Sequence, residues 1–395
     1  MLRFGASIVG GVSAGLLTLS GSSKAATGKH GAAAAASKLI VVDCGSGWTR
    51  LEQFSISAQS GLVHLDSSVR LEASAPLDSV LATGQLKDVQ AWVCNLREAV
   101  DKVAGSEAAS GSEAASGSEP SNFKKCPTPV QIGATAGVRD AIASGVVAPN
   151  FMTAFGKEVD YQFSAGQFSL LSGPQEASLE LVAARYCAQA VGISGEVGLL
   201  SSGGASSQAV FRTEDGEGKE ALLQCLSLNT LLKKKGNSAC LEHGITEGLK
   251  LYSEHLDSAL QPLEAFRGSP AIGGAATIVC IEMLGAAGER AGIGHRTLPA
   301  GEARRKVAAF LSDWQAAAVQ KKKQADDSEK MSWRDVVHGT IAMQAVRLLS
   351  VLSEDCPVYM ARGFTLPDGN SLKPSWALGK YLLETGQVRQ DDTTA

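Results

Sequence analysis

The sequence lacks the signatures of several common protein classes. It has no Cys-x-x-Cys pair, no His-x-His and no His-Glu-x-x-His, so no zinc ribbon, thioredoxin-like site or histidine metal site is indicated. It also has no Asn-x-Ser/Thr sequon, and aromatic residues make up only 5% of the chain. The eight cysteines leave disulfides open, with Cys225 and Cys240 close enough in sequence to bridge one loop. Most of them are expected to be small buried side chains.

A strong net charge of either sign is absent as well. The 395 residues carry a formal net charge of −4, whereas nucleic-acid-binding proteins usually present a basic face. Hydrophobic residues make up 44% of the chain, which supports a substantial core. A length of 395 residues is enough for one large domain or two ordinary ones. We therefore expect a folded protein that is a monomer and binds no nucleic acid.

Residues 1–26 are typical of a targeting segment. Arg3 precedes an apolar run at 4–19, and small residues follow at 23–26, which predicts a secretory signal peptide. The run is rich in glycine and short for a membrane span, so an uncleaved anchor is one alternative. No acid occurs before Asp43, so a transit peptide for an organelle is another. We expect a lumenal, extracellular or membrane-anchored protein of the secretory pathway, with membrane association only through this segment.

Hydrophobic periodicity predicts alternating strands and helices from about residue 37 onward. Between two of the predicted elements, residues 105–120 repeat Gly-Ser-Glu-Ala-Ala-Ser, a low-complexity composition typical of an exposed, mobile loop. The mixture of elements predicts an α/β fold. The predicted strands are 39–43, 48–56, 129–132, 196–200, 208–212 and 275–281, and the predicted helices are 79–104, 176–191, 246–261, 302–324, 333–353 and 375–384.

One strand–turn–strand unit occurs twice, as LIVVDCGSGWTRLEQFSI at 39–56 and VGLLSSGGASSQAVFRT at 197–213. Glycines and small residues let backbone N–H groups converge on an anion, and Ser and Thr hydroxyls add donors. A single turn of this kind is most often an ordinary hairpin. Two such hairpins that face each other would hold a polyphosphate from both sides.

Hydrolysis of a phosphoanhydride needs further groups. A divalent metal must offset the phosphate charge, and a base must orient the attacking water. Asp43, at the end of the first predicted strand, is a candidate acid on the metal side, directly or through bound water. Glu176 follows Ser-Gly-Pro-Gln at the start of a predicted helix and is the candidate base. The alternative is that Glu176 only complements the helix N-terminus.

Five short segments, in order, resemble the conserved regions of the apyrase family, the nucleoside triphosphate diphosphohydrolases. The resemblance implies a two-lobed, actin-like fold, each lobe a sheet of the ribonuclease-H type flanked by helices, with the active site in the inter-lobe cleft. It places lobe I at 38–168, lobe II at 169–366 and a helix at 367–390 that returns to lobe I. The segments are Asp43–Arg50, Ala134–Arg139, Ser172–Ala177 with Tyr186, Gly203–Gln208 and Ser375–Leu383.

The resemblance also implies a reaction and a set of roles. Water would attack the terminal phosphorus of a nucleoside di- or triphosphate directly, with Mg²⁺ or Ca²⁺ bound. Trp376 and Arg139 are expected to be structural. The implied roles are Glu176 as base, Asp43 beside the metal and its waters, Ser46, Gly47 and Trp48 at the terminal phosphate, Thr135 near the scissile group, Gly203, Gly204 and Ala205 in the phosphate-binding turn, and Ser206 and Gln208 orienting the water.

Two departures from the family pattern leave the substrate open. The fourth segment is preceded by Ser201 where the family has Asp, although Ser201 could still hydrogen-bond a metal-bound water. The third segment reads Gln-Glu-Ala, and its Ser-Gly-x-x-Glu-Ala pattern also resembles exopolyphosphatases, which share the superfamily fold. The main hypothesis is therefore a nucleotide hydrolase. The alternatives are an exopolyphosphatase-like phosphoanhydride hydrolase, or a nucleotide-binding protein whose catalysis is weakened or lost because of Ser201.

Overall fold

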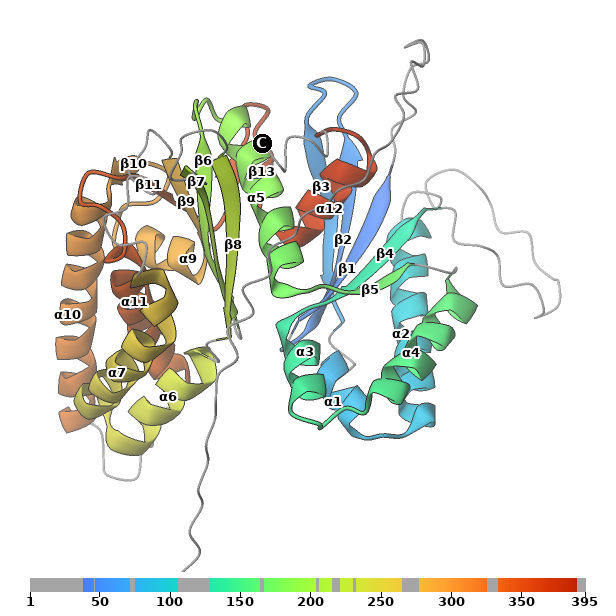
Figure 1. Cartoon of the computed structure of the whole chain (residues 1–395), viewed down its shortest axis with the longest axis horizontal. Coiled ribbons are helices and arrows are strands. Elements are labelled where there is room, and N and C mark those ends of the chain that lie inside the picture. The colour runs from blue at the N-terminus through green and yellow to red at the C-terminus, as the bar shows by residue number, and fades with distance from the viewer. Residues whose placement is uncertain are drawn as a thin grey trace, which may run out of the picture.

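Two mixed β-sheets lie side by side in the computed structural model, with helices between them and on their outer faces (Figure 1). The predicted targeting segment at 1–26 and the low-complexity tract from residue 106 onward lie outside the described residues. No helix in the described part of the chain is long and apolar enough to cross a membrane. The structure describes residues 38–45, 47–71, 75–105, 128–163, 167–203, 206–214, 221–229, 232–264, 277–324 and 333–388.

The first sheet has the order β3-β2-β1-β4-β5. Its first three strands pair antiparallel, and β4 and β5 continue the sheet in parallel with β1. Ile40 and Val42 on β1 face a core shared with the helices of the outer face. The strands are β1 Leu39–Cys44, β2 Thr49–Ile56, β3 Val63–Arg70, β4 Val130–Ala134 and β5 Phe168–Leu170, and the helices are α1 Leu77–Ala82, α2 Leu86–Gly105, α3 Ala136–Ala143 and α4 Pro149–Gln162.

The second sheet repeats this plan with the order β10-β11-β9-β6-β7-β8. Here β6, β7 and β8 pair antiparallel, while β9 and β11 extend the sheet in parallel with β6. In the described part of the chain, five helices pack on its outer face around one core. The strands are β6 Val197–Ser202, β7 Ser206–Glu214, β8 Ala221–Asn229, β9 Thr277–Glu282, β10 Thr297–Pro299 and β11 Pro357–Met360, and the helices are α6 Leu232–His243, α7 Ile245–Glu264, α9 Met283–Arg290, α10 Ala300–Gln324 and α11 Trp333–Leu349.

Two helices fill the space between the sheets: α5 Gly173–Ala190 and α12 Trp376–Glu384 (Figure 1). Their apolar side chains share one core with Val41 of β1 and Leu199 of β6. The helices approach closely, because a Cβ added at Gly379 would lie 1.9 Å from the carbonyl oxygen of Leu179. The chain therefore returns at its end to cover the inner face of the first sheet.

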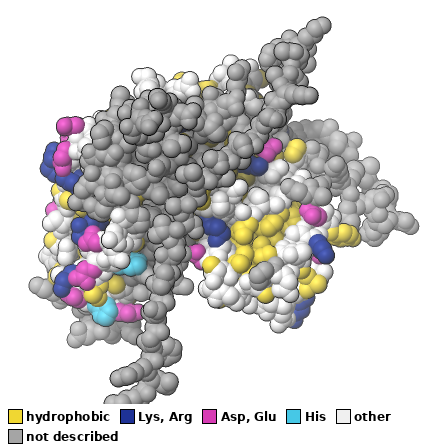
Figure 2. Space-filling model, in the orientation of Figure 1, with side chains coloured by type: hydrophobic (Ala, Val, Ile, Leu, Met, Phe, Trp, Pro, Cys, Tyr) yellow, Lys and Arg dark blue, Asp and Glu magenta, His cyan; other side chains and the backbone are white. Residues whose placement is uncertain are grey.

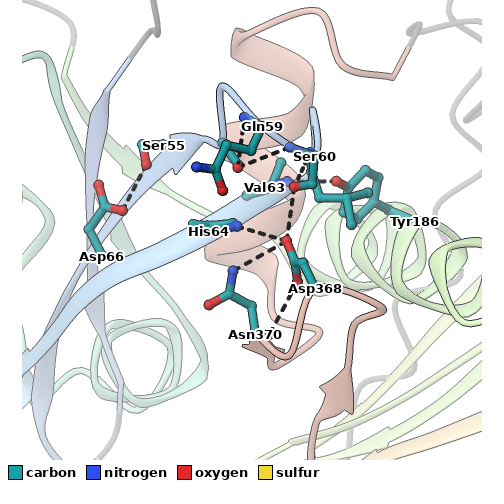
Figure 3. Close-up of polar contacts among 11 residues, drawn as sticks. Ser55, Gln59, Ser60, Val63, His64, Asp66, Tyr186, Asp368 and Asn370 are labelled. Atoms are coloured by element: carbon teal, nitrogen blue, oxygen red, sulfur yellow. Dashed lines mark hydrogen bonds and ion pairs between the residues drawn. The ribbon is translucent and has the colours of Figure 1, made fainter.

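A polar network connects the β2–β3 hairpin with α5 and with the segment that contains Asp368 (Figure 3). Asp368 accepts a hydrogen bond from Ser60 Oγ and contacts His64 Nε2, both at 2.9 Å. Asp368 precedes β13 Ser371–Leu372, which pairs with β12 Phe364–Thr365. On the other side, the Tyr186 hydroxyl on α5 accepts a hydrogen bond from Val63 N at 2.8 Å.

The arrangement confirms the predicted fold class and both predicted hairpins, since β1 pairs with β2 and β6 with β7. The single helix predicted at 79–104 is wrong. It is divided into α1 and α2 at Gly84, whose φ of 65° cannot continue a right-handed helix. The predicted lobe boundary after residue 168 falls inside β5. No disulfide bridge between Cys225 and Cys240 forms, because Cys240 is a free, buried thiol.

Candidate active site

The first predicted turn brings Asp43 to the inner face of the first sheet. Gly45 N donates to Trp48 O at 3.0 Å and closes the turn after β1. The indole Nε1 of Trp376, the first residue of α12, donates to Asp43 Oδ1 at 3.0 Å. Burial raises the pKa of Asp43 to about 7, and the charge of Glu52 adds to the rise. Trp376, expected to be structural, thus contacts a predicted site residue directly.

Trp376 reaches Asp43 because β4 carries no side chain at the crossing point. Gly133 pairs with Asp43 in the parallel register of β1 and β4. A Cβ at Gly133 would lie 2.4 Å from Cη2 of Trp376, so any larger residue would displace the indole. Thr135 follows at the start of α3, and its backbone N donates to Cys44 O at 3.4 Å. The structure therefore places Thr135 next to the end of β1, and its contact with the scissile group stays a prediction.

The second turn is closed in the same way as the first. Gly203 N donates to Ser206 O at 2.9 Å, at the position equivalent to the Gly45–Trp48 contact. Ser201 and Gln208 are register partners on β6 and β7, and both are buried. Gln208 Nε2 donates to Ser206 Oγ at 2.8 Å, so these two predicted water-orienting residues lie together.

The back of this second hairpin is fixed by a buried polar group. Ser202 and Ser207 lie on the opposite face from Ser201 and Gln208, because side chains alternate along a strand. Their hydroxyls are 3.0 Å apart, and Gln344 of α11 donates to both. The hairpin that carries the predicted site residues is therefore anchored to the outer helix layer.

Glu176 lies in the first turn of α5. Ser172 caps this helix, and its side chain and that of Gln175 bond reciprocally to each other's backbone N–H. Glu176 is buried, and Arg139 of α3 donates to its Oε2 from both terminal nitrogens, at 3.0 and 3.1 Å. Burial raises the pKa of Glu176, and the Arg139 guanidinium opposes that rise. Arg139, expected to be structural, is the cation that fixes the candidate base.

The remaining predicted phosphate-binding residues are only partly described. Trp48 is 38% exposed, and the guanidinium carbons of Arg50 and Arg70 lie 5.4 and 4.7 Å from its ring centroid. Gly47 is exposed beside it. The contact of Trp48 and Gly47 with a phosphate stays a prediction. Ser46, Gly204 and Ala205 lie outside the described residues.

Sequence reasoning missed two acidic residues close to Glu176. Glu180 lies one turn after Glu176 on α5 and is buried. Its i,i+4 spacing from Glu176 was the available signal, since such residues share one face of a helix. Glu282 ends β9 with a φ of 58° and a ψ of −123°, and its Oε1 lies 2.8 Å from Lys373 Nζ. No sequence pattern indicates this strained backbone.

The described residues do not form a direct metal site. Within the described ranges, no group of three or more His, Cys, Asp or Glu side chains is placed to hold a metal ion. Oδ1 of Asp43 is bound by Trp376, and Oε2 of Glu176 is bound by Arg139. Binding of Mg²⁺ or Ca²⁺ through water at Asp43, with help from Ser201, stays a prediction.

No protein-family model and no curated protein matches the chain. Solved structures do match. A Ppx/GppA family member from Aquifex aeolicus has a TM-score of 0.56 at 16% identity, over 89% of this chain and 98% of that chain. A PPX-GPPA enzyme of the same organism has a TM-score of 0.54 at 16% identity, over 88% and 99%. An exopolyphosphatase from Cytophaga hutchinsonii has a TM-score of 0.50 at 12% identity, over 91% and 100%.

These similarities show the fold, which is the predicted two-lobed, actin-like α/β fold. They do not show the apyrase family that the sequence motifs resemble. The similar structures are instead Ppx/GppA proteins and an exopolyphosphatase.

On the face seen in Figure 2, the basic and acidic side chains of the described residues are interspersed.

Proposed function

We propose that the protein is a phosphoanhydride hydrolase that removes the terminal phosphate of a polyphosphate chain, as an exopolyphosphatase does. The observation that carries the proposal is the pair of equivalent turns, each closed by the same backbone hydrogen bond, with Asp43 at the end of the strand that leads into the first turn. Among proteins of this fold are an exopolyphosphatase and a Ppx/GppA phosphatase, which supports phosphoanhydrides as the substrate class.

Glu176 is the proposed base. Its pairing with Arg139 fixes one carboxylate oxygen and favours the anionic form in a buried position. The carboxylate accepts a proton from water while the water oxygen forms a bond to the terminal phosphorus. The bond from that phosphorus to the bridging oxygen breaks, and the shortened chain leaves with the bond's electron pair. Ser206 and Gln208, which are hydrogen-bonded to each other, orient the water.

Nucleoside di- and triphosphates are the second candidate substrates, in keeping with the apyrase-like motifs. A bound divalent cation would neutralise phosphate charge in either case. The resemblance of Gly203–Gln208 to the fourth apyrase segment supports this second candidate.

The test is phosphate release by the purified protein from long-chain polyphosphate, tripolyphosphate, ATP and ADP, with Mg²⁺, Ca²⁺ or EDTA. Glu176→Gln is expected to lower kcat by about 10²- to 10⁴-fold, the range for loss of a general base. Glu247→Gln is the matched control, because Glu247 also lies in the first turn of a helix but is exposed. Nucleotide binding without release from any substrate would instead identify a binding protein that lacks catalysis.

A further inference from the structure

Two buried polar atoms near Glu176 make no hydrogen bond of good geometry in the described part of the chain. They are Oε2 of Glu180 and Oγ of Ser201. Glu180 is 6% exposed and Ser201 is 1% exposed. Buried polar groups are nearly always hydrogen-bonded to protein or ordered water, so two such atoms together need an explanation.

The two side chains face each other across the contact between α5 and β6. Leu199 packs in the core that α5 shares, and Ser201, two residues further along the strand, points to the same side. Burial raises the pKa of Glu180, as do the charges of Glu176, Glu282 and Asp43, while the nearby Ser201 hydroxyl, a donor aimed at the carboxyl group without good hydrogen-bond geometry, lowers it. Glu180 therefore lies among the carboxylates of the site and beside Ser201.

Unlike Glu176 and Glu282, two of its acidic neighbours, Glu180 has no cation among the described residues. Glu176 is paired with Arg139, Glu52 with Arg50 and Glu282 with Lys373. Within the described ranges Glu180 has no ion pair. A lone buried acid on the inner face of a helix is costly for stability, and a fold keeps such a group where function requires it.

We propose that Glu180 and Ser201 together bind the water that attacks the terminal phosphorus, with Glu180 supplying a carboxyl group that strand position 201 does not carry. Such a water satisfies both unpartnered atoms and lies next to Gln208, the register partner of Ser201. Its proton passes to Glu176, one helical turn away. This inference rests on the proposed function.

The test moves the carboxyl group from the helix to the strand. Glu180→Leu is expected to lower kcat by about 100-fold with KM changed by less than about threefold, because the water and not substrate affinity is affected. Its Tm is expected to stay unchanged or to rise, since a buried unpaired acid is replaced by an apolar group. Adding Ser201→Asp to Glu180→Leu is expected to recover about tenfold of kcat.

Two further variants make the result decisive. Ser201→Asp alone is the control and is expected to raise neither kcat nor Tm, because it places a second carboxyl group beside Glu180. Glu180→Gln keeps the shape and is expected to lose less activity than Glu180→Leu, and it replaces that variant should Leu prevent folding. The inference is overturned by wild-type kcat in the Glu180 variants, by a loss that follows a lower Tm, or by a double variant no better than Glu180→Leu. Absence of phosphate release by the wild-type protein would instead reject the proposed function, and this inference with it.

Discussion

Arg139 donates to Oε2 of Glu176 from both terminal guanidinium nitrogens, at 3.0 and 3.1 Å. The contact joins α3 on the first sheet to α5 between the sheets. Arg139 also donates to the carbonyl oxygen of Leu171, just before α5 begins. One side chain thus fixes both the start of α5 and the carboxylate in its first turn.

Replacement of Arg139 by Met is expected to destabilise the protein by about 3 kcal/mol, because it leaves the buried Glu176 carboxylate without its cation. Urea unfolding monitored by circular dichroism measures the change. Arg296→Met is the control: Arg296 is exposed and donates only to Gly292 O in the described structure, so a change within about 0.5 kcal/mol is expected. Equal stability of the two variants would contradict a structural role for the ion pair.

Gly379→Ala is expected to destabilise the protein strongly, because the new Cβ would lie 1.9 Å from Leu179 O and would push α12 away from α5. Gly156→Ala is the matched control. Gly156 is also helical, nothing lies within 4 Å of its Cβ position, and a gain of about 1 kcal/mol is expected from helix propensity. Thermal unfolding of both variants checks the opposite signs. A stable Gly379→Ala protein would show that the helices can separate at little cost.

Trp376→Phe is expected to cost more stability at pH 8 than at pH 5. The indole hydrogen bond lowers the pKa of Asp43, which burial raises to about 7, so its loss raises that pKa further. A raised folded-state pKa contributes stability that is present at low pH and lost as pH rises through it. Denaturant unfolding at the two pH values measures the difference, and an equal cost at both would contradict the role of the indole.

Asp368→Asn is expected to reduce the acid sensitivity of the fold. The hydrogen bond with His64, together with those from Asn370 N and Ser60, lowers the pKa of Asp368 to about 2 (Figure 3). The stabilisation is therefore present above pH 4 and is lost as pH falls toward 2. The Tm of the wild-type protein should fall more steeply over this interval than that of the variant. Asp66→Asn, which removes one bond from Ser55, should behave like the wild type.

Local pattern was enough to predict much of the fold. The apolar runs at 39–43 and 277–281 lie in strands that are largely buried, and their composition alone indicates this. The mainly exposed strand β3 has no such run, and it was not predicted. The break between α1 and α2 was missed because helical periodicity continues across Gly84.

A site residue could be predicted where one short segment both fixes its place in the fold and contains its reactive side chain. Glu176 could be placed from Ser-Gly-Pro-Gln-Glu, because those residues cap and start its helix. The side chains that bind the two carboxylates could not be predicted from the sequence. Arg139 and Glu176 are 37 positions apart, Trp376 and Asp43 are 333 positions apart, and no local rule links either pair. The strained φ at Glu282 depends on tertiary packing in the same way.

The late position of α12 in the chain has a consequence for biosynthesis. A ribosome releases the first sheet long before it makes Trp376, so the part of the inner face of β1 that α12 covers, including Val41, stays uncovered until that helix is made. Pairing across so large a sequence separation also makes closure slow. A nascent chain without α12 therefore lacks the indole that binds Asp43 and exposes an apolar surface on its first sheet.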